Sequence, residues 1–323
     1  MANMKISVCI TVFNEESSIG ELLNSLINQT KKPDEIIIID GLSQDRTVDV
    51  IKHYQKKDFR IKLVIEPGCV AHGRNVSIEL ARNSIVALTD AGCIAKPDWL
   101  AKISEPFKSE EVGMVAGFYE MPYNNSLQRA MNLFHGITIK QYEPKSFLPS
   151  ARSVAFRKEV WEEVGGFNEN LTKASEDTDY FYKLVKNNVK IVRVGKARVI
   201  WQETKSFTLK DSINKFYQYA KGDAQAGIWW HPTQKLASHN IKVVVVFIRY
   251  LIGIILLIYS FSHPITIYAL ILGLLIYVIW AYHKVYSQTK DIHSGYWGIL
   301  IQFMSDFAVM TGFLSGITGR RIK

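Results

Sequence analysis

Three acidic side chains follow apolar runs of the kind that form buried strands. Glu15 comes just after ISVCITVF, Asp40 ends EIIIID, and Asp90 ends SIVALTD. A carboxylate accepts hydrogen bonds from ribose hydroxyls and from a ring N–H of uracil or guanine, and it is a hard ligand for a divalent cation. Carboxylates at strand ends could therefore contact a nucleotide or a cation, with the alternative that Asp40 caps the next helix and Glu15 is a solvated turn residue.

Asp90 is followed by Ala91 and Gly92, so a second carboxylate is missing at this turn. Mg²⁺ and Mn²⁺ need few protein ligands when phosphate oxygens and water complete the octahedron, so one aspartate can suffice. Gly92 leaves room beside it, and Glu203 in VIWQET is a candidate further ligand. The alternative is that Asp90 only caps a turn and binds no metal.

Two further segments carry groups suited to catalysis and phosphate binding. Glu176 and Asp177 begin a helical pattern in ASEDTDYFYKLVKNN, where a carboxylate can act as a general base or simply complement the helix dipole. In HGRN, Gly73 allows close backbone approach and Arg74 offers a forked donor to phosphate oxygens. The alternative for Arg74 is a surface position in the first turn of a helix.

The elements that position these groups alternate strand and helix. Residues 6–13, 35–40, 61–66 and 84–90 are predicted strands by length and β-branching, and the segments between them have helical spacing. Two later segments, 112–120 and 151–157, are also predicted to be strands. A capping box, Ser18-x-x-Glu21, is expected to begin the first helix. This alternation predicts an α/β fold with a doubly wound, mainly parallel sheet, whose carboxyl ends bring the acidic residues together.

The C-terminal part is apolar enough for a membrane. Residues 243–262 and 265–282 each approach the length of a span and form a predicted hairpin, and the lysines flanking its open end place the N-terminal domain in the cytoplasm. Arg249 lies within the first span and either snorkels to the headgroups or contacts a lipid phosphate. The flanking lysines are Lys235, Lys242, Lys284 and Lys290.

The last apolar segment, 298–318, is predicted as an interfacial or re-entrant helix, with a third span as the alternative. Crossing the membrane would place Arg320, Arg321 and Lys323 outside, against the positive-inside rule. The small face Gly312-x-x-x-Gly316 is expected to pack on the hairpin.

Composition narrows the class of protein. The net charge of +9 suits phosphate-bearing substrates and an anionic membrane surface, and no stacked-aromatic motif for nucleic acid accompanies it. Three scattered cysteines without C-x-x-C spacing indicate a reduced compartment and neither disulfides nor zinc.

Four motifs in order resemble those of glycosyltransferases of family two. They read VCITVFNEE, IIIIDGLSQDRT, LTDAG and ASEDTD, and the resemblance covers about residues 4–230. It implies a GT-A fold, Mg²⁺ or Mn²⁺ on Asp90, and Asp177 as catalytic base supported by Glu176. Asp-Ala-Gly departs from the family's usual DxD motif. The implied donor-binding residues are Thr11, Glu15, Asp40, Arg74, Asp90, Ala91 and Lys221.

Lys221 is included among the donor-binding residues because of a weaker similarity. FYQYAKGDAQAG resembles the Gln-x-x-Arg-Trp element of processive members, with Gln218 and Lys221 in place and Gly222 where the family has Trp. The missing Trp argues against synthesis of a long polymer, and a plain linker helix over 209–230 is the alternative.

Together these observations predict a cytoplasmic catalytic domain over 1–235 and a membrane region over 236–323, located in the cell membrane. The expected activity is inverting transfer of a sugar from a UDP- or GDP-linked donor to a lipid-linked or polyprenyl-phosphate acceptor in cell-surface glycan or glycolipid synthesis. One alternative is an inactive nucleotide-sugar-binding membrane scaffold. A nucleotidyltransferase is disfavoured because NEESSIG lacks a Gly-rich basic signature.

Overall fold

The computed structural model describes residues 4–145, 147–227, 229–231, 236–237 and 239–319. Within these ranges the chain divides into two compact units. The first comprises the described residues up to Pro122 together with Thr138–Glu203, and the second comprises Tyr123–Ile137 and the residues from Thr204 onward. The division falls at Glu203 and removes an internal segment from the first unit, so it differs from the boundary predicted near residue 235.

One half of the central sheet has the predicted parallel arrangement. Its strands β1 (Ile6–Val12), β2 (Glu35–Asp40), β3 (Ile61–Ile65) and β4 (Ile85–Leu88) lie in the order β3-β2-β1-β4, and each pairing is parallel. The connecting helices are α1 (Ile19–Ile27), α2 (Thr47–Gln55) and α3 (Val70–Glu79). Because all four strands run the same way, the loops that follow them share one edge of the sheet.

The other half of the sheet is mixed. It continues through β7 (Val154–Arg157), β6 (Met114–Glu120), β8 (Ile191–Trp201) and β5 (Cys93–Ala95). The pairs β4–β7, β6–β7 and β5–β8 are antiparallel, whereas β6–β8 is parallel. The predicted strands at 112–120 and 151–157 therefore exist, and the antiparallel part belongs to this half.

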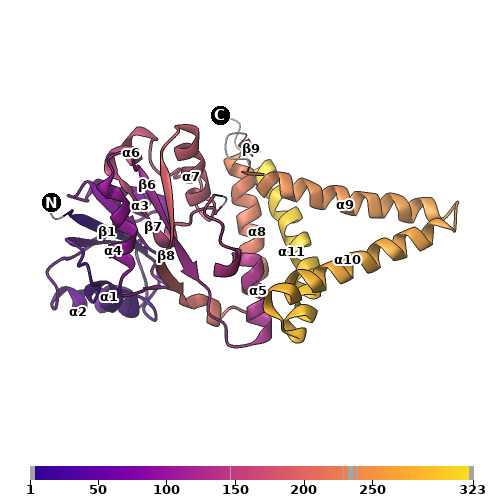
Figure 1. Cartoon of the computed structure of the whole chain (residues 1–323), viewed down its shortest axis with the longest axis horizontal. Coiled ribbons are helices and arrows are strands. Elements are labelled where there is room, and N and C mark those ends of the chain that lie inside the picture. Colours follow the sequence, from indigo (N-terminus) through magenta and orange to yellow (C-terminus); the bar gives the residue numbers. More distant parts are fainter. Residues whose placement is uncertain (1–3, 146, 228, 232–235, 238, 320–323) are drawn as a thin grey trace. The chain divides into compact units, whose positions relative to one another are not determined.

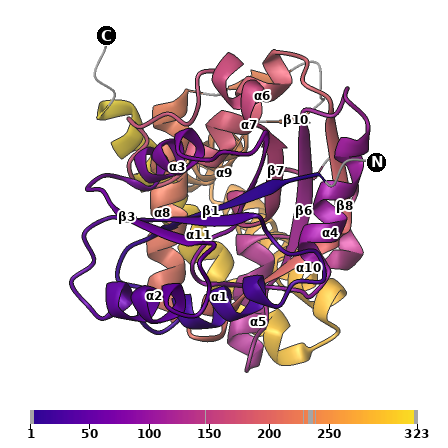
Figure 2. The same ribbon diagram turned by 90° about the vertical axis from the view of Figure 1, so that its left-hand side faces the viewer.

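Helices cover both faces of the sheet, as Figure 2 shows, with α1 and α2 on one side and α3, α6 (Lys158–Glu163) and α7 (Glu176–Lys186) on the other. On the second side, alternate strand residues such as Cys9, Ile37 and Leu88 form a buried cluster with Ile78 of α3 and Leu184 of α7. A short helix, α4 (Trp99–Ser104), precedes β6. This core fixes the strand ends that carry the candidate chemistry.

The predicted capping box is wrong. Ser18 is the N-cap of α1 but makes no side-chain cap hydrogen bond. Its backbone lies in the helical region (φ −119°, ψ −35°) and its hydroxyl is directed at the carboxylate of Glu15, to which it donates.

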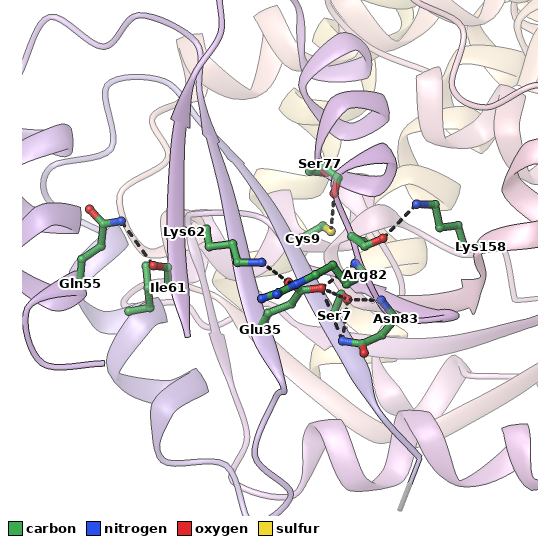
Figure 3. A network of polar contacts seen from close by, with 11 residues as sticks. Ser7, Cys9, Glu35, Gln55, Ile61, Lys62, Ser77, Arg82, Asn83 and Lys158 are labelled. Carbon is green, nitrogen blue, oxygen red and sulfur yellow. Dashed lines mark hydrogen bonds and ion pairs between the residues drawn. The ribbon is translucent and has the colours of Figure 1, made fainter. Parts of the chain in front are cut away.

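A buried polar network joins the amino ends of the strands, opposite the candidate site (Figure 3). Glu35 of β2 is 2% exposed, and its carboxylate accepts hydrogen bonds from Ser7 Oγ, Lys62 Nζ and the Arg82 backbone N–H. Burial alone would raise its pKa, but the hydrogen bonds from Lys62, Ser7 and Arg82 outweigh that effect and lower the pKa to about 2. This network ties β1, β2 and β3 to the segment before β4.

The second unit is helical. It contains α5 (Ser126–His135), α8 (Leu209–Ala226), α9 (His239–Ser260), α10 (Thr266–Thr289) and α11 (Ile292–Thr318), with a small hairpin of β9 (Trp230–His231) and β10 (Leu236–Ala237). Figure 1 shows α9 and α10 as a helical hairpin. Three helices of the described chain are long and apolar enough to cross a membrane: Asn240–Ser260, Thr266–Thr289 and Ile292–Thr318.

The small face of α11 packs on α8 and not on the hairpin. A Cβ added at Gly312 would lie 2.3 Å from the backbone oxygen of Tyr217, and one at Gly316 would lie 2.4 Å from that of Lys221. The prediction that these glycines face the hairpin is therefore wrong, because backbone contact with α8 occupies the small face. The charges used to judge whether 298–318 crosses the membrane, Arg320, Arg321 and Lys323, lie outside the described residues.

Candidate active site

The loops after β1 and β2 are joined by reciprocal hydrogen bonds. Asn14 accepts from the Gln44 backbone N–H at 2.8 Å, and its own N–H donates to Ser43 Oγ at 2.8 Å. The Glu15 N–H donates to Thr47 Oγ1 at 2.7 Å. Asn14 has φ of 55°, a left-handed conformation that asparagine tolerates better than most residues. The two loops therefore form one polar rim at the carboxyl edge of the sheet.

Glu15 contributes a carboxylate to this rim. Partial burial raises its pKa, and the negative charges of Glu203, Asp90 and Asp45 act in the same direction. The fold thus brings three acidic residues, from separate segments of the sequence, within electrostatic range of Glu15.

Asp40 is fully buried. Its Oδ1 accepts from the Ser43 backbone N–H at 2.9 Å and its Oδ2 from Ser43 Oγ at 2.5 Å, so it holds the turn after β2. Because Asp40 is 0% exposed, a contact with ribose or base would require the turn after β2 to move. Donor binding by Asp40 remains a prediction, while its role in the turn is observed.

Arg74 joins two parts of the site. Its Nη2 donates to Asp90 Oδ1 at 3.0 Å, and its Nη1 donates to Glu176 Oε1 at 2.5 Å. The side chain is only 5% exposed. A guanidinium can do this because its rigid fork presents several N–H groups in one plane. Contact between Arg74 and a diphosphate stays a prediction; the structure shows that Arg74 positions two carboxylates.

The other residues of HGRN anchor α3. A Cβ at Gly73 would lie 2.9 Å from Thr11 Cγ2, so α3 packs directly against β1 at this point. Asn75 Nδ2 donates to Phe167 O at 2.9 Å, and Asn75 Oδ1 accepts from the Phe167 N–H at 2.9 Å. His72 Nδ1 lies 3.0 Å from Glu169 Oε2. Thr11, predicted to bind the donor, is here the packing partner of Gly73.

Glu176 and Asp177 begin α7 just after Ser175, whose φ of 71° places it in the left-handed region. Burial raises the pKa of Glu176, against the opposing effect of Arg74. Asp177 is half-buried, and its Oδ2 accepts from the Ala151 N–H at 3.3 Å and its Oδ1 from the Thr178 N–H at 2.8 Å. Ser175 is not a glycine, and left-handed backbone geometry at such a residue is a form of strain that often accompanies functional sites.

The turn after β4 has oxygen ligands suitable for a hard cation. A Cβ at Gly92 would lie 3.3 Å from Glu203 Oε1, so glycine leaves space for that carboxylate, and Ala91 beside Asp90 is buried. The described residues contain no group of three or more His, Cys, Asp or Glu side chains placed to hold a metal. Asp90 with Glu203 therefore fits Mg²⁺ or Mn²⁺ only where donor phosphate oxygens and water complete the coordination.

Arg152 is a site residue that sequence reasoning missed. Its guanidinium carbon lies 3.7 Å from the centre of the Trp201 ring, and its Nε lies 3.9 Å from Asp90 Oδ2. It comes from the segment before β7, which the sequence marked only as a strand, so no local motif indicated it. Asn75 and Glu169 were also missed as anchors, although Asn75 lies inside the HGRN segment.

Lys221 lies on α8 in the second unit. Its donor-binding role therefore stays a prediction, separate from the site assembled in the first unit.

Comparison with known proteins identifies the family. The model described as Glycosyl transferase family 2 matches residues 7–165. The resemblance predicted from the sequence is therefore confirmed: the chain carries a domain of glycosyltransferase family 2.

Named relatives are glycosyltransferases. Glycosyltransferase AglE of Haloferax volcanii is 28% identical over 190 residues, which cover 54% of this chain and 62% of AglE. The O-antigen chain rhamnosyltransferase WbaN of Salmonella anatum is 26% identical over 213 residues, covering 61% of this chain and 65% of WbaN. The chain thus matches less than two thirds of the length of these relatives.

Solved structures share the fold. The mannosyltransferase PcManGT from Pyrobaculum calidifontis, in complex with GDP-Man and Mn²⁺, has a TM-score of 0.54 at 18% identity and covers 70% of this chain and 64% of its own. S. aureus TarS has a TM-score of 0.51 at 20% identity, covering 67% of this chain and 39% of its own. The likeness confirms the GT-A fold.

Proposed function

We propose that this protein is an inverting glycosyltransferase that takes a sugar from a nucleotide-linked donor. The observation that carries the proposal is the bridge made by Arg74 between Asp90 and Glu176. Through this bridge Asp90, the candidate metal ligand, lies near Glu176, the neighbour of the candidate catalytic base Asp177, although these residues come from separate motifs. Family membership supports the same reaction class.

Asp177 is the proposed base. Its carboxylate would remove the proton from the acceptor hydroxyl as that oxygen attacks the anomeric carbon, and the nucleotide would leave from the opposite face with the bonding electrons. Two backbone N–H groups orient the carboxylate, from Ala151 and Thr178. Asp90, with Glu203 beside it, would hold Mg²⁺ or Mn²⁺, which supplies positive charge to the departing diphosphate.

The proposed acceptor is linked to a lipid. The three candidate spans support a location at the membrane, and the lysines at the open end of the hairpin support a cytoplasmic catalytic unit. The name of WbaN, an O-antigen chain rhamnosyltransferase, supports a role in cell-surface glycan synthesis. A UDP- or GDP-linked sugar is the proposed donor.

Thermal stabilisation of the full chain in detergent by UDP, GDP and CDP, with and without Mn²⁺, tests the donor site. A ligand that binds only the folded state raises the unfolding midpoint, so we expect one nucleotide to raise it in a metal-dependent way and Asp90→Ala to abolish the shift. If no nucleotide shifts the midpoint with or without metal, the donor site is not functional and an inactive membrane scaffold becomes the better assignment.

Replacement of the base tests the reaction. Asp177→Asn should lower the transfer rate by about 10²–10⁴-fold, since the amide cannot take the proton, while nucleotide binding is retained. Asp179→Asn is the matched control, because Asp179 lies in the same helical turn and pairs with Lys183 at 3.3 Å. Equal rates for Asp177→Asn and the wild type would show that the base is another group.

A further inference from the structure

A chain of polar side chains crosses the three long helices of the second unit. Asp306 of α11 is 2% exposed, and its Oδ2 accepts from Arg249 Nη2 of α9 at 2.7 Å and from Tyr250 and Tyr277 hydroxyls. Its Oδ1 accepts from Gln302 Nε2 at 3.0 Å. Gln302 Oε1 in turn accepts from Lys284 Nζ of α10 at 2.9 Å. The snorkelling expected for Arg249 is replaced by an ion pair.

The positive charge in this polar chain exceeds the negative charge. Arg249 and Lys284 are cationic, and Asp306 is the single acidic side chain among them. Along the sequence of α9–α11 and the turns between them, the other acidic residue is Asp291, which caps α11 by accepting from the backbone N–H groups of His293 and Ser294. One positive charge therefore has no acidic counterpart in this part of the chain.

Hydrogen-bond donors also outnumber acceptors in this polar chain. Both oxygens of Asp306 already accept bonds, whereas a guanidinium and an ammonium together carry eight N–H donors. Within the described residues Arg249 Nε has no hydrogen-bond partner, and Lys284 otherwise faces the ring of Phe134 at 4.0 Å and that of Trp280. An added group with several acceptor oxygens and negative charge would match this surplus.

The position of the polar chain restricts which anion could reach it. Lys284 lies five residues before the end of α10, about 8 Å along the helix, and Arg249 lies nine residues after Asn240, about 14 Å along the first candidate span. The Arg249 side chain is 33% exposed. Uncompensated charge inside a span is costly, and such residues commonly mark binding sites.

We propose that Arg249 and Lys284 bind the phosphate of the lipid-linked acceptor, with Asp306 and Gln302 holding the two cations in place. The inference rests on the proposed function, because it names where the acceptor of that reaction is held. The shared chemistry is a lipid phosphate, whose two sources are a polyprenyl phosphate and the headgroup of a bulk anionic phospholipid.

Binding to the full chain in phosphatidylcholine nanodiscs tests the site. The probes are a polyprenyl phosphate, the corresponding polyprenol and phosphatidylglycerol, and bound lipid is measured by native mass spectrometry. We expect the polyprenyl phosphate to bind better than either other lipid. Lys284→Gln should weaken its binding by about tenfold or more, since hydrogen bonds to charged groups contribute strongly when buried.

Two further variants keep the result interpretable. Arg249→Gln with Asp306→Asn removes both members of the ion pair together, so neither is left without the other, and it should weaken binding similarly. Lys242→Gln removes one charge from an exposed position of α9 and should leave binding unchanged. Unchanged binding in the first two variants, or equal loss in Lys242→Gln, would overturn the site. Equal binding of phosphatidylglycerol would assign it to bulk phospholipid and overturn the acceptor role.

Nucleotide stabilisation separates this inference from the proposed function. Variants at the site should keep the nucleotide-dependent rise in unfolding midpoint of the wild type. If the wild type shows no such rise yet binds polyprenyl phosphate through Arg249 and Lys284, the transferase proposal fails and the lipid site stands.

Discussion

At the scale of single residues, Arg74 organises the candidate active site. It comes from α3, and its partners lie 16 and 102 residues away in the sequence. Because the guanidinium is nearly inaccessible to solvent, its two carboxylates depend on it for compensation.

Arg74→Gln should lower the free energy of unfolding by about 3–5 kcal/mol, because it leaves Asp90 and Glu176 without their buried cation. Chemical denaturation in detergent measures the change. Arg82→Gln is the control: that side chain is 73% exposed, and its partner Glu35 keeps the hydrogen bonds from Ser7, Lys62 and the Arg82 backbone N–H, so we expect a loss of less than about 1 kcal/mol. Adding Glu176→Gln to Arg74→Gln should recover part of the loss; equal, small losses for both arginines would contradict the bridge.

We expect the stability of the fold to depend on pH through the charge of His72. The hydrogen bond to Glu169 raises the pKa of His72 against the effect of burial, and Glu66 acts in the same direction as Glu169. A group whose pKa is raised on folding stabilises the fold at low pH, and this contribution disappears as pH rises through the folded pKa. The midpoint difference between wild type and His72→Gln should therefore be largest near about pH 6 and shrink towards about pH 8. A difference that grows with pH would show that the imidazole is not the charged partner of Glu169.

At the scale of elements, the packing of α3 on β1 decides where Arg74 lies. Thr11 is β-branched and has few rotamers with which to avoid a new neighbour. The glycine at position 73 is therefore a condition for the close approach of helix and strand, and not a sign of flexibility.

Gly73→Ala should destabilise the protein by about 1–3 kcal/mol, because the added methyl lies 2.9 Å from Thr11 Cγ2. Gly20→Ala in α1 is the matched control: its new methyl would make ordinary contact with Val50 at 3.6 Å, and helix propensity favours it by up to about 1 kcal/mol. Thermal unfolding of the two variants should move in opposite directions. A stabilised Gly73→Ala would mean that α3 and β1 have room to separate.

At the scale of the whole molecule, the catalytic fold and the membrane helices are not independent in sequence. Helix α5 lies between parts of the first unit but belongs to the second. There the Ser126 backbone oxygen accepts from Ser294 Oγ at 3.0 Å, and the ring of His135 stacks on that of Phe216 with centroids 4.6 Å apart. The family match at 7–165 includes this helix.

A chain that stops after Lys205 should therefore expose the packed face of α5 and aggregate without detergent. The measurement is the fraction that stays in the supernatant after ultracentrifugation, with and without detergent. Phe134→Ser in the shortened chain should raise that fraction, because Phe134 otherwise packs near Lys284 and Phe216. A shortened chain that is soluble and monomeric without detergent would show that α5 needs no partner from α8 to α11.

The sequence by itself determined the elements and the edge at which the chemistry gathers. Apolar runs define β1, β2 and β4, and the shared direction of parallel strands places Glu15, Asp40 and Asp90 at one edge whatever their exact partners are. The length and low charge of 243–282 likewise determined two apolar helices of spanning length. These are properties of local pattern, which a single sequence contains.

Only the tertiary structure decided which groups meet. It paired Arg74 with Asp90 and Glu176, engaged Asp40 with Ser43, and added the antiparallel strands. It also placed Gly312 against α8 and joined Arg249 to Asp306 across two helices. The physical reason is that hydrogen bonds and close packing act over a few ångströms between segments far apart in the chain. The spacing of residues along the sequence does not show which distant side chain each of them will contact.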